Sequence, residues 1–437
     1  MKWTVICKAG KDDNFLADLK PYDPRLIMQF DDSLRSRQVE NNVLQVITQN
    51  GLQVDETIID LLHFAMSVYT ADLRIERNFA KDKWSREITL ELPVVDLKRW
   101  EKTSEIIASM LAFLTGDRWT IRLRERQIVE RPPVKNRATS HPNAVTLFSG
   151  GLDSFAGAID LLENSRGLTA LVGHYGRGST NPRQVATAEV LKNAYPGQTL
   201  RLGFYVQPTK PGERSTEDTM RSRSILFLAL GTAIASACGE NVPLYVSENG
   251  LISLNIPLTY TRMGSLSTRT THPYFMQLYM KMLEELEIDV PILLPYKFHT
   301  KGEMLRNTRN QEVLSAGLPG TLSCARPERA RFAGHSPGTH CGYCVPCIIR
   351  LSSMKAAGFD LTDAAYFDVV NEDPKPTTVP GGDSRAFKMA IERMRTLSPL
   401  ELVGEVLQSG PLSPDEINQF KDVYVRGLNE VASFLQV

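Results

Sequence analysis

Ser149-Gly-Gly-Leu-Asp-Ser154 lies between two apolar runs, Ala144–Phe148 and Phe155–Leu162. This order predicts a buried strand, a glycine turn and the first turn of a helix. The N–H groups at the start of a helix have no partner within the helix, and the helix dipole there favours negative charge. The stretch is therefore expected to bind an anion such as a phosphate.

The residue types within this loop suit phosphate binding. Gly150 and Gly151 allow positive φ and close approach of a phosphate to the backbone. Ser149 and Ser154 add hydroxyl donors, and Asp153 can hold Mg²⁺ or orient a neighbouring loop. The chain contains no Gly-x-x-x-x-Gly-Lys-Ser/Thr pattern, which excludes a Walker A loop. The stretch instead resembles the pyrophosphate loop of the ATP pyrophosphatases, which cleave ATP between its α and β phosphates and form adenylates.

Predicted strands and helices alternate from Asn143 to about Pro295. Repeated β–α units imply a mostly parallel sheet that binds ligands at the carboxyl ends of its strands, where the loop falls. We therefore expect an α/β core over 143–357, similar to the adenine nucleotide alpha hydrolase-like fold of pyrophosphate-loop proteins. Strands are expected at Ala144–Phe148, Leu168–His174, Thr199–Tyr205, Pro243–Ser247 and Pro291–Leu294. Helices are expected at Phe155–Glu163, Pro182–Ala194, Ser222–Cys238 and His272–Glu287.

The segments before the core show other sequence patterns. Residues 1–130 are expected to form an α+β domain, with antiparallel strands at Glu87–Val94 and Trp119–Arg124 and helices at Glu56–Tyr69 and Trp100–Leu114. His63 is expected to be a core or flank histidine. The proline-containing segment 131–142 is predicted to be a linker.

Residues 358–437 are predicted to form a helical extension. Ser398-Pro-Leu-Glu401 and Ser413-Pro-Asp-Glu416 both resemble helix N-caps with a capping-box glutamate. An apolar stripe follows the second of these, and we interpret it as core packing rather than a partner groove. The stripe consists of Ile417, Phe420, Val423, Tyr424 and Leu428.

Composition narrows the class of protein. The 437 residues are enough for two or three domains, and 50 basic residues balance 50 acidic ones. Such a balance does not favour broad nucleic-acid binding. Met1–Leu19 lacks the shape of a signal peptide, and the apolar stretch Ile225–Cys238 is too short to cross a bilayer. We expect a cytoplasmic protein without a membrane partner.

Four of the six cysteines lie close together in the chain. In a chain without a secretion signal, this clustering indicates metal binding rather than disulfides. Four thiolates can complete a closed, structural zinc site, while an iron–sulfur cluster is the competing interpretation. His335 and His340 are substitute ligands if Cys324 does not bind the metal. The predicted ligands are Cys324, Cys341, Cys344 and Cys347.

The loop and the cysteines together resemble the 7-cyano-7-deazaguanine synthase (QueC) family of pyrophosphate-loop enzymes. The resemblance covers about residues 144–355, half of the chain. Further stretches that resemble the family, in order, are Arg221–Leu230, Ser247-Glu-Asn-Gly250, Thr271-His-Pro273, His299-Thr-Lys-Gly-Glu-Met304 and Cys347-x-x-Arg350.

The resemblance implies a reaction and roles for residues. In that family, ATP adenylates the carboxylate of 7-carboxy-7-deazaguanine, ammonia gives the amide, and a second ATP dehydrates it to the nitrile. The cofactors implied here are ATP and Mg²⁺ beside the zinc. Ser149, Gly150, Gly151, Asp153, Ser154 and Arg223 would bind the nucleotide. The catalytic residues would be Asp153, Ser154, Lys301 and Arg221. Base recognition or loop support would involve Asn249, His272 and Glu303.

Two departures separate the chain from the short enzymes. Tyr274 stands where the family has an aspartate, and the spacing from Cys324 to Cys341 is roughly doubled. Longer QueC-like proteins with extra domains occur in bacterial anti-phage operons, including the Qat and CBASS systems. Similarity to that branch implies coupling of a deazaguanine carboxylate to the N-terminal amine of an operon-encoded partner protein. The alternatives are nitrile synthesis for queuosine, tRNA thiolation and a non-catalytic nucleotide-binding scaffold.

Overall fold

The computed structural model describes residues 1–31, 33–129, 131, 134, 140–176, 178, 180–209, 216–217, 219–258, 269–325, 327–332, 334–336, 338–361 and 379–437. Most of the predicted linker, 131–142, falls outside these ranges. Within the described residues, no helix combines the length and the apolarity needed to cross a lipid bilayer.

The core sheet has the strand order β10-β9-β6-β7-β8-β3, and all of its pairs are parallel except β8 with β3. The predicted α/β core is therefore confirmed, with each expected strand and helix present. The strands are β6 (Ala144–Leu147), β7 (Thr169–Tyr175), β8 (Thr199–Pro208), β9 (Leu244–Tyr245) and β10 (Ile292–Leu293). The helices are α5 (Leu152–Asn164), α6 (Thr180–Ala194), α7 (Arg223–Cys238) and α9 (Pro273–Glu285).

A second sheet lies in the N-terminal part, with the order β2-β1-β4-β5. Its strands are β1 (Lys2–Ala9), β2 (Arg25–Phe30), β4 (Glu87–Val94) and β5 (Arg118–Glu125). The expectation of antiparallel strands is wrong, because every neighbouring pair is parallel. Alternating polarity identified β4 and β5 but carries no information on strand direction. Two of the three polar positions of β4 do not face water either, since Thr89 and Glu91 are buried while Glu87 is exposed.

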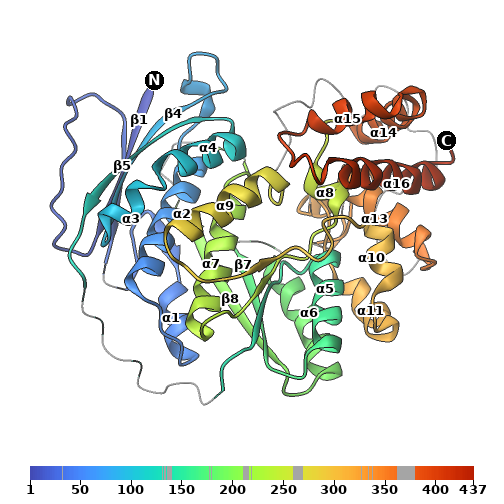
Figure 1. Cartoon of the computed structure of the whole chain (residues 1–437), viewed down its shortest axis with the longest axis horizontal. Coiled ribbons are helices and arrows are strands. Elements are labelled where there is room, and N and C mark those ends of the chain that lie inside the picture. The colour runs from blue at the N-terminus through green and yellow to red at the C-terminus, as the bar shows by residue number, and fades with distance from the viewer. Residues whose placement is uncertain are drawn as a thin grey trace.

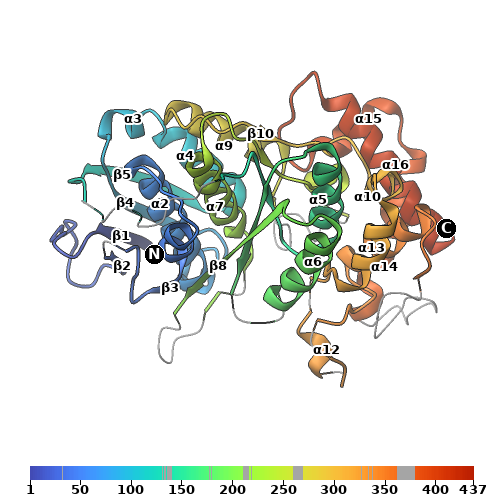
Figure 2. The ribbon, with the colours of Figure 1, turned by 90° about the horizontal axis from the view of Figure 1, so that it is seen from below.

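Helices join the two sheets into one body. Figure 1 shows α2 (Glu56–Arg74) and α7 between the sheets, with α5 and α6 on the opposite face of the core sheet; Figure 2 shows the same layers from below. One apolar cluster contains Val5, Phe64, Val172 and Leu226, so both sheets share a core. Strand β3 (Val39–Asn41) lies within the predicted N-terminal domain but pairs with the core sheet.

Shorter helices occur throughout the first 356 residues. The helix predicted at Trp100–Leu114 is divided by a turn at 102–103 into α3 (Leu97–Glu101) and α4 (Ser104–Thr115). His63 is buried on α2, as predicted. The remaining helices of the described residues before the tail are α1 (Val43–Gln49), η1 (Arg77–Phe79), α8 (Gly250–Leu254), α10 (Lys301–Asn307), α11 (Gln311–Gly317), η3 (Leu318–Gly320), α12 (Arg329–Phe332) and α13 (Val345–Ala356).

The C-terminal extension contains α14 (Val379–Thr396), α15 (Pro399–Leu407) and α16 (Ile417–Leu435). Ser398 caps α15 through the predicted capping box. The cap predicted at Ser413 is wrong: α16 starts after Glu416 without a side-chain cap bond, because Ser413 lies in a preceding turn. Four of the five stripe residues, Phe420, Val423, Tyr424 and Leu428, are buried against α8 and α13, so the stripe is core packing.

Candidate functional site

The loop between β6 and α5 lies at the carboxyl end of a central strand. Gly150 has φ +77°, and a side chain there would come within 3.1 Å of the Gln184 backbone nitrogen. Gly151 is the N-cap of α5, and its N–H donates to Ser149 Oγ at 3.2 Å. Ser154 Oγ lies 3.1 Å from Ser149 Oγ. The structure therefore brings the predicted loop residues together at the start of a helix.

A cavity of about 400 Å³ opens on this loop, and we call it the loop cavity. Its volume lies in the range of small-molecule sites. Residues from seven separate parts of the chain line it, which is how parallel sheets assemble sites at strand ends. The polar and ionisable lining residues are Ser149, Asp153, Ser154, Arg223, Ser224, Ser247, Glu248, Thr270, Thr271, Lys301, Ser323 and Cys324.

Asp153 and Lys301 form the charged centre of the loop cavity. Lys301 Nζ lies 3.0 Å from Asp153 Oδ1, and both side chains are almost inaccessible to water. The other carboxylate oxygen, Oδ2, accepts a hydrogen bond from Asn249 Nδ2 at 2.6 Å. Asn249 also caps α8 through its side-chain oxygen. The structure thus places three predicted residues in one network, with Asn249 supporting Asp153.

The two predicted arginines lie in different environments. Arg223 lines the loop cavity, and no described carboxylate forms an ion pair with it. Its burial lowers the pKa of the guanidinium. Arg221 does not line the cavity: its Nη1 donates to Thr115 O at 2.9 Å, and its guanidinium stacks on Trp84. Arg223 is therefore the arginine placed to meet an anion at the loop.

His174 and Gln184 hold Arg223 and the loop in position, and neither residue was predicted from the sequence. Arg223 Nε donates to His174 Nδ1 at 3.1 Å, and Arg223 Nη2 donates to His174 O at 3.0 Å. Burial and the neighbouring guanidinium lower the pKa of His174 to about 3. The neutral ring thus donates from Nε2 to Val206 O and accepts at Nδ1. Gln184 Nε2 bridges His174 O and Ser149 O, which links the arginine to the loop.

Glu248 is a second functional candidate that the sequence analysis did not single out. Burial and the nearby Asp153 carboxylate raise the pKa of Glu248 to about 7, although Lys301 and a hydrogen bond from Thr271 act in the opposite direction. Thr271 Oγ1 donates to Glu248 Oε2 at 3.2 Å. A carboxylate that titrates near neutrality in a cavity is typical of functional sites. In the sequence, Glu248 follows β9 at a strand end and lies within the Ser247–Gly250 stretch.

None of the three predicted substrate residues, Asn249, His272 and Glu303, lines the loop cavity. His272 is the N-cap of α9, where its Nδ1 accepts from Tyr274 N at 3.2 Å, and its Nε2 lies 3.0 Å from Ser409 Oγ. Glu303 completes the capping box of α10 with Thr300 and pairs with Arg426. Both side chains therefore support helix ends rather than line the cavity.

The four predicted cysteines come together beside the loop cavity. Their sulfur atoms all lie within 4.8 Å of one another, with Cys324–Cys344 and Cys341–Cys347 at 3.9 Å. Four sulfurs around zinc at 2.3 Å would be about 3.8 Å apart, so the set fits a tetrahedral zinc site. Gly342, with φ +84°, forms the turn between ligands. Cys324 also lines the loop cavity, so a metal there would hold this wall in place.

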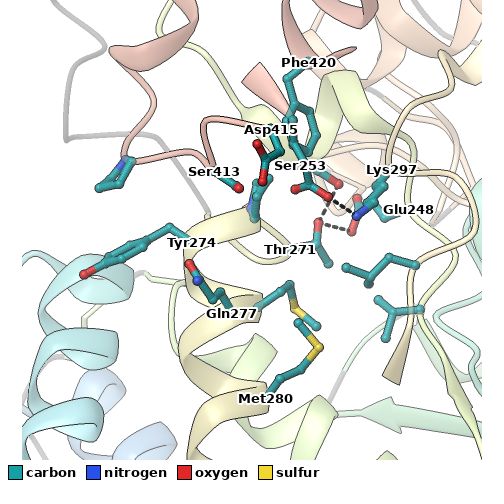
Figure 3. A pocket seen from close by; sticks show the side chains of 16 residues that line it. Glu248, Ser253, Thr271, Tyr274, Gln277, Met280, Lys297, Ser413, Asp415 and Phe420 are labelled. Atoms are coloured by element: carbon teal, nitrogen blue, oxygen red, sulfur yellow. Dashed lines mark hydrogen bonds and ion pairs between the residues drawn. The ribbon is translucent and has the colours of Figure 1, made fainter. Parts of the chain in front are cut away.

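A second cavity of about 330 Å³ adjoins the first, and we call it the tail cavity (Figure 3). Val246, Glu248 and Thr271 line both cavities. One wall of the tail cavity comes from α9 and includes Tyr274. The opposite wall comes from the C-terminal extension and consists of Pro411, Ser413, Asp415, Glu416 and Phe420.

Comparison of the chain with known protein families found no matching family model, and no curated protein matches it.

Proposed function

We propose that this protein is an ATP-dependent, adenylate-forming carbon–nitrogen ligase. Its loop cavity would take ATP and a carboxylate substrate, and it would release AMP and pyrophosphate. One observation carries the proposal: the Ser149–Ser154 loop, Lys301 and Arg223 line the same cavity. The helix N-terminus, Lys301 and Arg223 are the groups that would attract phosphates in this cavity, which Asp153 and Glu248 also line.

The first half of the proposed reaction forms an acyl adenylate. A carboxylate oxygen of the substrate attacks the α-phosphorus of ATP, and the bond from that phosphorus to the β-bridging oxygen breaks. Lys301 and Arg223 would stabilise the negative charge that develops on the leaving pyrophosphate. Asp153 would keep Lys301 in position and offers the carboxylate oxygen that the Mg²⁺ accompanying ATP takes.

The second half forms an amide. An amine nitrogen attacks the acyl carbon, the carbon–nitrogen bond forms, and AMP leaves with the electrons of the acyl–oxygen bond. The nitrogen loses its protons to a nearby base and to solvent. We propose 7-carboxy-7-deazaguanine as the carboxylate, because the loop and the cysteines occur in the same order as in QueC-like enzymes. The proposed acceptor is the N-terminal amine of an operon-encoded partner protein in anti-phage defence.

Product analysis tests this assignment. The purified protein would be incubated with Mg-ATP and 7-carboxy-7-deazaguanine, with and without its operon neighbours, and all products recorded by mass spectrometry. AMP together with a base-sized adduct on a neighbour's N-terminus is the expected result. AMP together with free 7-cyano-7-deazaguanine would instead assign a nitrile synthase. An adduct that persists in Asp153→Ala would contradict the assigned site.

A further inference from the structure

The tail cavity adjoins the loop cavity, and the residues at their boundary line both cavities. Glu248 and Thr271 line both spaces, and the Thr271 hydroxyl donates to the Glu248 carboxylate. A molecule in the tail cavity would therefore meet Glu248 at the boundary with the loop cavity. Two adjoining cavities suit a reaction in which two substrates meet at one carbon.

The charges that line the tail cavity favour a cation. Glu416 is paired with Lys297 (Figure 3), so these two charges balance. Asp415 is exposed and forms no ion pair among the described residues, and Glu248 also lines the cavity. The described lining of the tail cavity thus contains three carboxylates and one ammonium group. An incoming positive charge would be attracted, whereas a second phosphate or carboxylate would be repelled.

Much of the remaining lining is apolar and comes from several parts of the chain. Met276 and Met280 line it from α9, and Phe420 lines it from α16. Phe420 is fully buried and packs against Phe298 with ring centroids 5.0 Å apart. The C-terminal extension therefore forms a fixed wall of the cavity, which places Asp415 at a defined position.

We infer that the tail cavity binds the amine substrate in its protonated form, with Asp415 and Glu248 as the carboxylates that receive it. This inference rests on the proposed function and assigns its second substrate to a site that the C-terminal extension completes. Before attack, one N–H proton passes from the ammonium group to the Glu248 carboxylate, which leaves a nitrogen lone pair free to form the bond to the acyl carbon. Burial and Asp153 keep the pKa of Glu248 near 7, which suits this transfer.

Two nucleophiles of different charge test the inference. Glycinamide is largely protonated at neutral pH and carries an amine like that of a protein N-terminus, whereas hydroxylamine is uncharged. Asp415→Lys is expected to raise the KM for glycinamide in amide formation by about tenfold or more. Hydroxamate formation from hydroxylamine, and ATP–pyrophosphate exchange without any amine, are expected to stay unchanged. The matched control is Asp422→Lys, because Asp422 is also exposed but lies on α16 away from the cavity lining.

The outcomes separate this inference from the proposed function. Exchange that is absent in the wild-type protein would overturn the proposed function and the inference with it. Exchange that is present while Asp415→Lys leaves the KM for glycinamide unchanged would overturn the inference alone. A raised KM for 7-carboxy-7-deazaguanine in exchange would also overturn it, because the tail cavity would then hold the carboxylate substrate.

Discussion

Lys301 Nζ lies 3.0 Å from Asp153 Oδ1, although the two residues start different helices, α10 and α5. The ion pair joins the predicted phosphate loop to a segment far along the chain. If Lys301 stabilises developing charge on pyrophosphate, Lys301→Met should lower kcat/KM of ATP–pyrophosphate exchange by about 100-fold. Lys192→Met is the control, since Lys192 is exposed on α6 and pairs only with Glu189 among the described residues. Equal rates for both variants would contradict the role of Lys301.

Gly150 and Gly197 have nearly the same positive φ, +77° and +76°. An alanine at either position should cost about 1–2 kcal/mol of stability through backbone strain. Only Gly150→Ala also places a methyl group 3.1 Å from the Gln184 backbone, while open space surrounds Gly197. Calorimetric titration with ATP should therefore show loss of binding in Gly150→Ala and retained binding in Gly197→Ala. Retained binding in both would mean that the loop does not hold the nucleotide.

His174 should act on ATP only through Arg223. Loss of the Nδ1 acceptor in His174→Leu, or of the guanidinium in Arg223→Met, is expected to weaken ATP binding by about tenfold. The double variant should bind ATP no more weakly than Arg223→Met, because the two residues form one unit. His174→Asn keeps an acceptor and should recover part of the affinity. If the losses of ATP affinity in the two single variants add up in the double variant, His174 supports the fold rather than Arg223.

The cysteine cluster should hold one zinc ion per chain, measured by elemental analysis of the purified protein. Cys344→Ser is expected to lose the metal and roughly 4 kcal/mol or more of stability, because metal binding is coupled to folding. Cys238→Ser is the matched control, since Cys238 is buried on α7 outside the cluster. Iron and inorganic sulfide in place of zinc would contradict this assignment.

Acid should destabilise the protein through its buried histidines. Burial lowers the pKa of His63 well below its ordinary value, and neither ring nitrogen has a hydrogen-bond partner among the described residues. The unfolded state therefore binds more protons than the folded state below about pH 6.5, and stability falls as the pH falls. His63→Leu should remove up to about 1.4 kcal/mol per pH unit from this dependence. Urea denaturation between pH 4 and 7 measures the slope, and an unchanged slope would contradict the account.

Periodicity and turn residues predicted the core sheet well. Each expected core strand is present, because buried parallel strands read as short apolar runs between loops and helices. The parallel pairing of β4 and β5 was not predictable. Alternation of polar and apolar residues identifies the buried face of a strand, but not the neighbouring strand or its direction. The pairing of β3, within the first 130 residues, with β8 of the core sheet could not be predicted, because it joins segments far apart in the chain.

The candidate site was predictable where a motif is contiguous. The glycine loop is one continuous stretch, and three of the four cysteines lie within seven residues, Cys341–Cys347, so the sequence pattern indicated both sites. His174, Gln184 and Glu248 were missed because their roles arise from contacts between strand ends and helices distant in sequence. Arg221 and Arg223 could not be separated by sequence, because only packing decides which one turns toward Trp84 and which toward the loop cavity.

The most direct test of the central claim is ATP–pyrophosphate exchange with labelled pyrophosphate, Mg-ATP and 7-carboxy-7-deazaguanine. The account predicts label in ATP only when the carboxylate is present, and none in Asp153→Ala. Exchange without the carboxylate, or no exchange although ATP binds, would contradict adenylate formation at this loop.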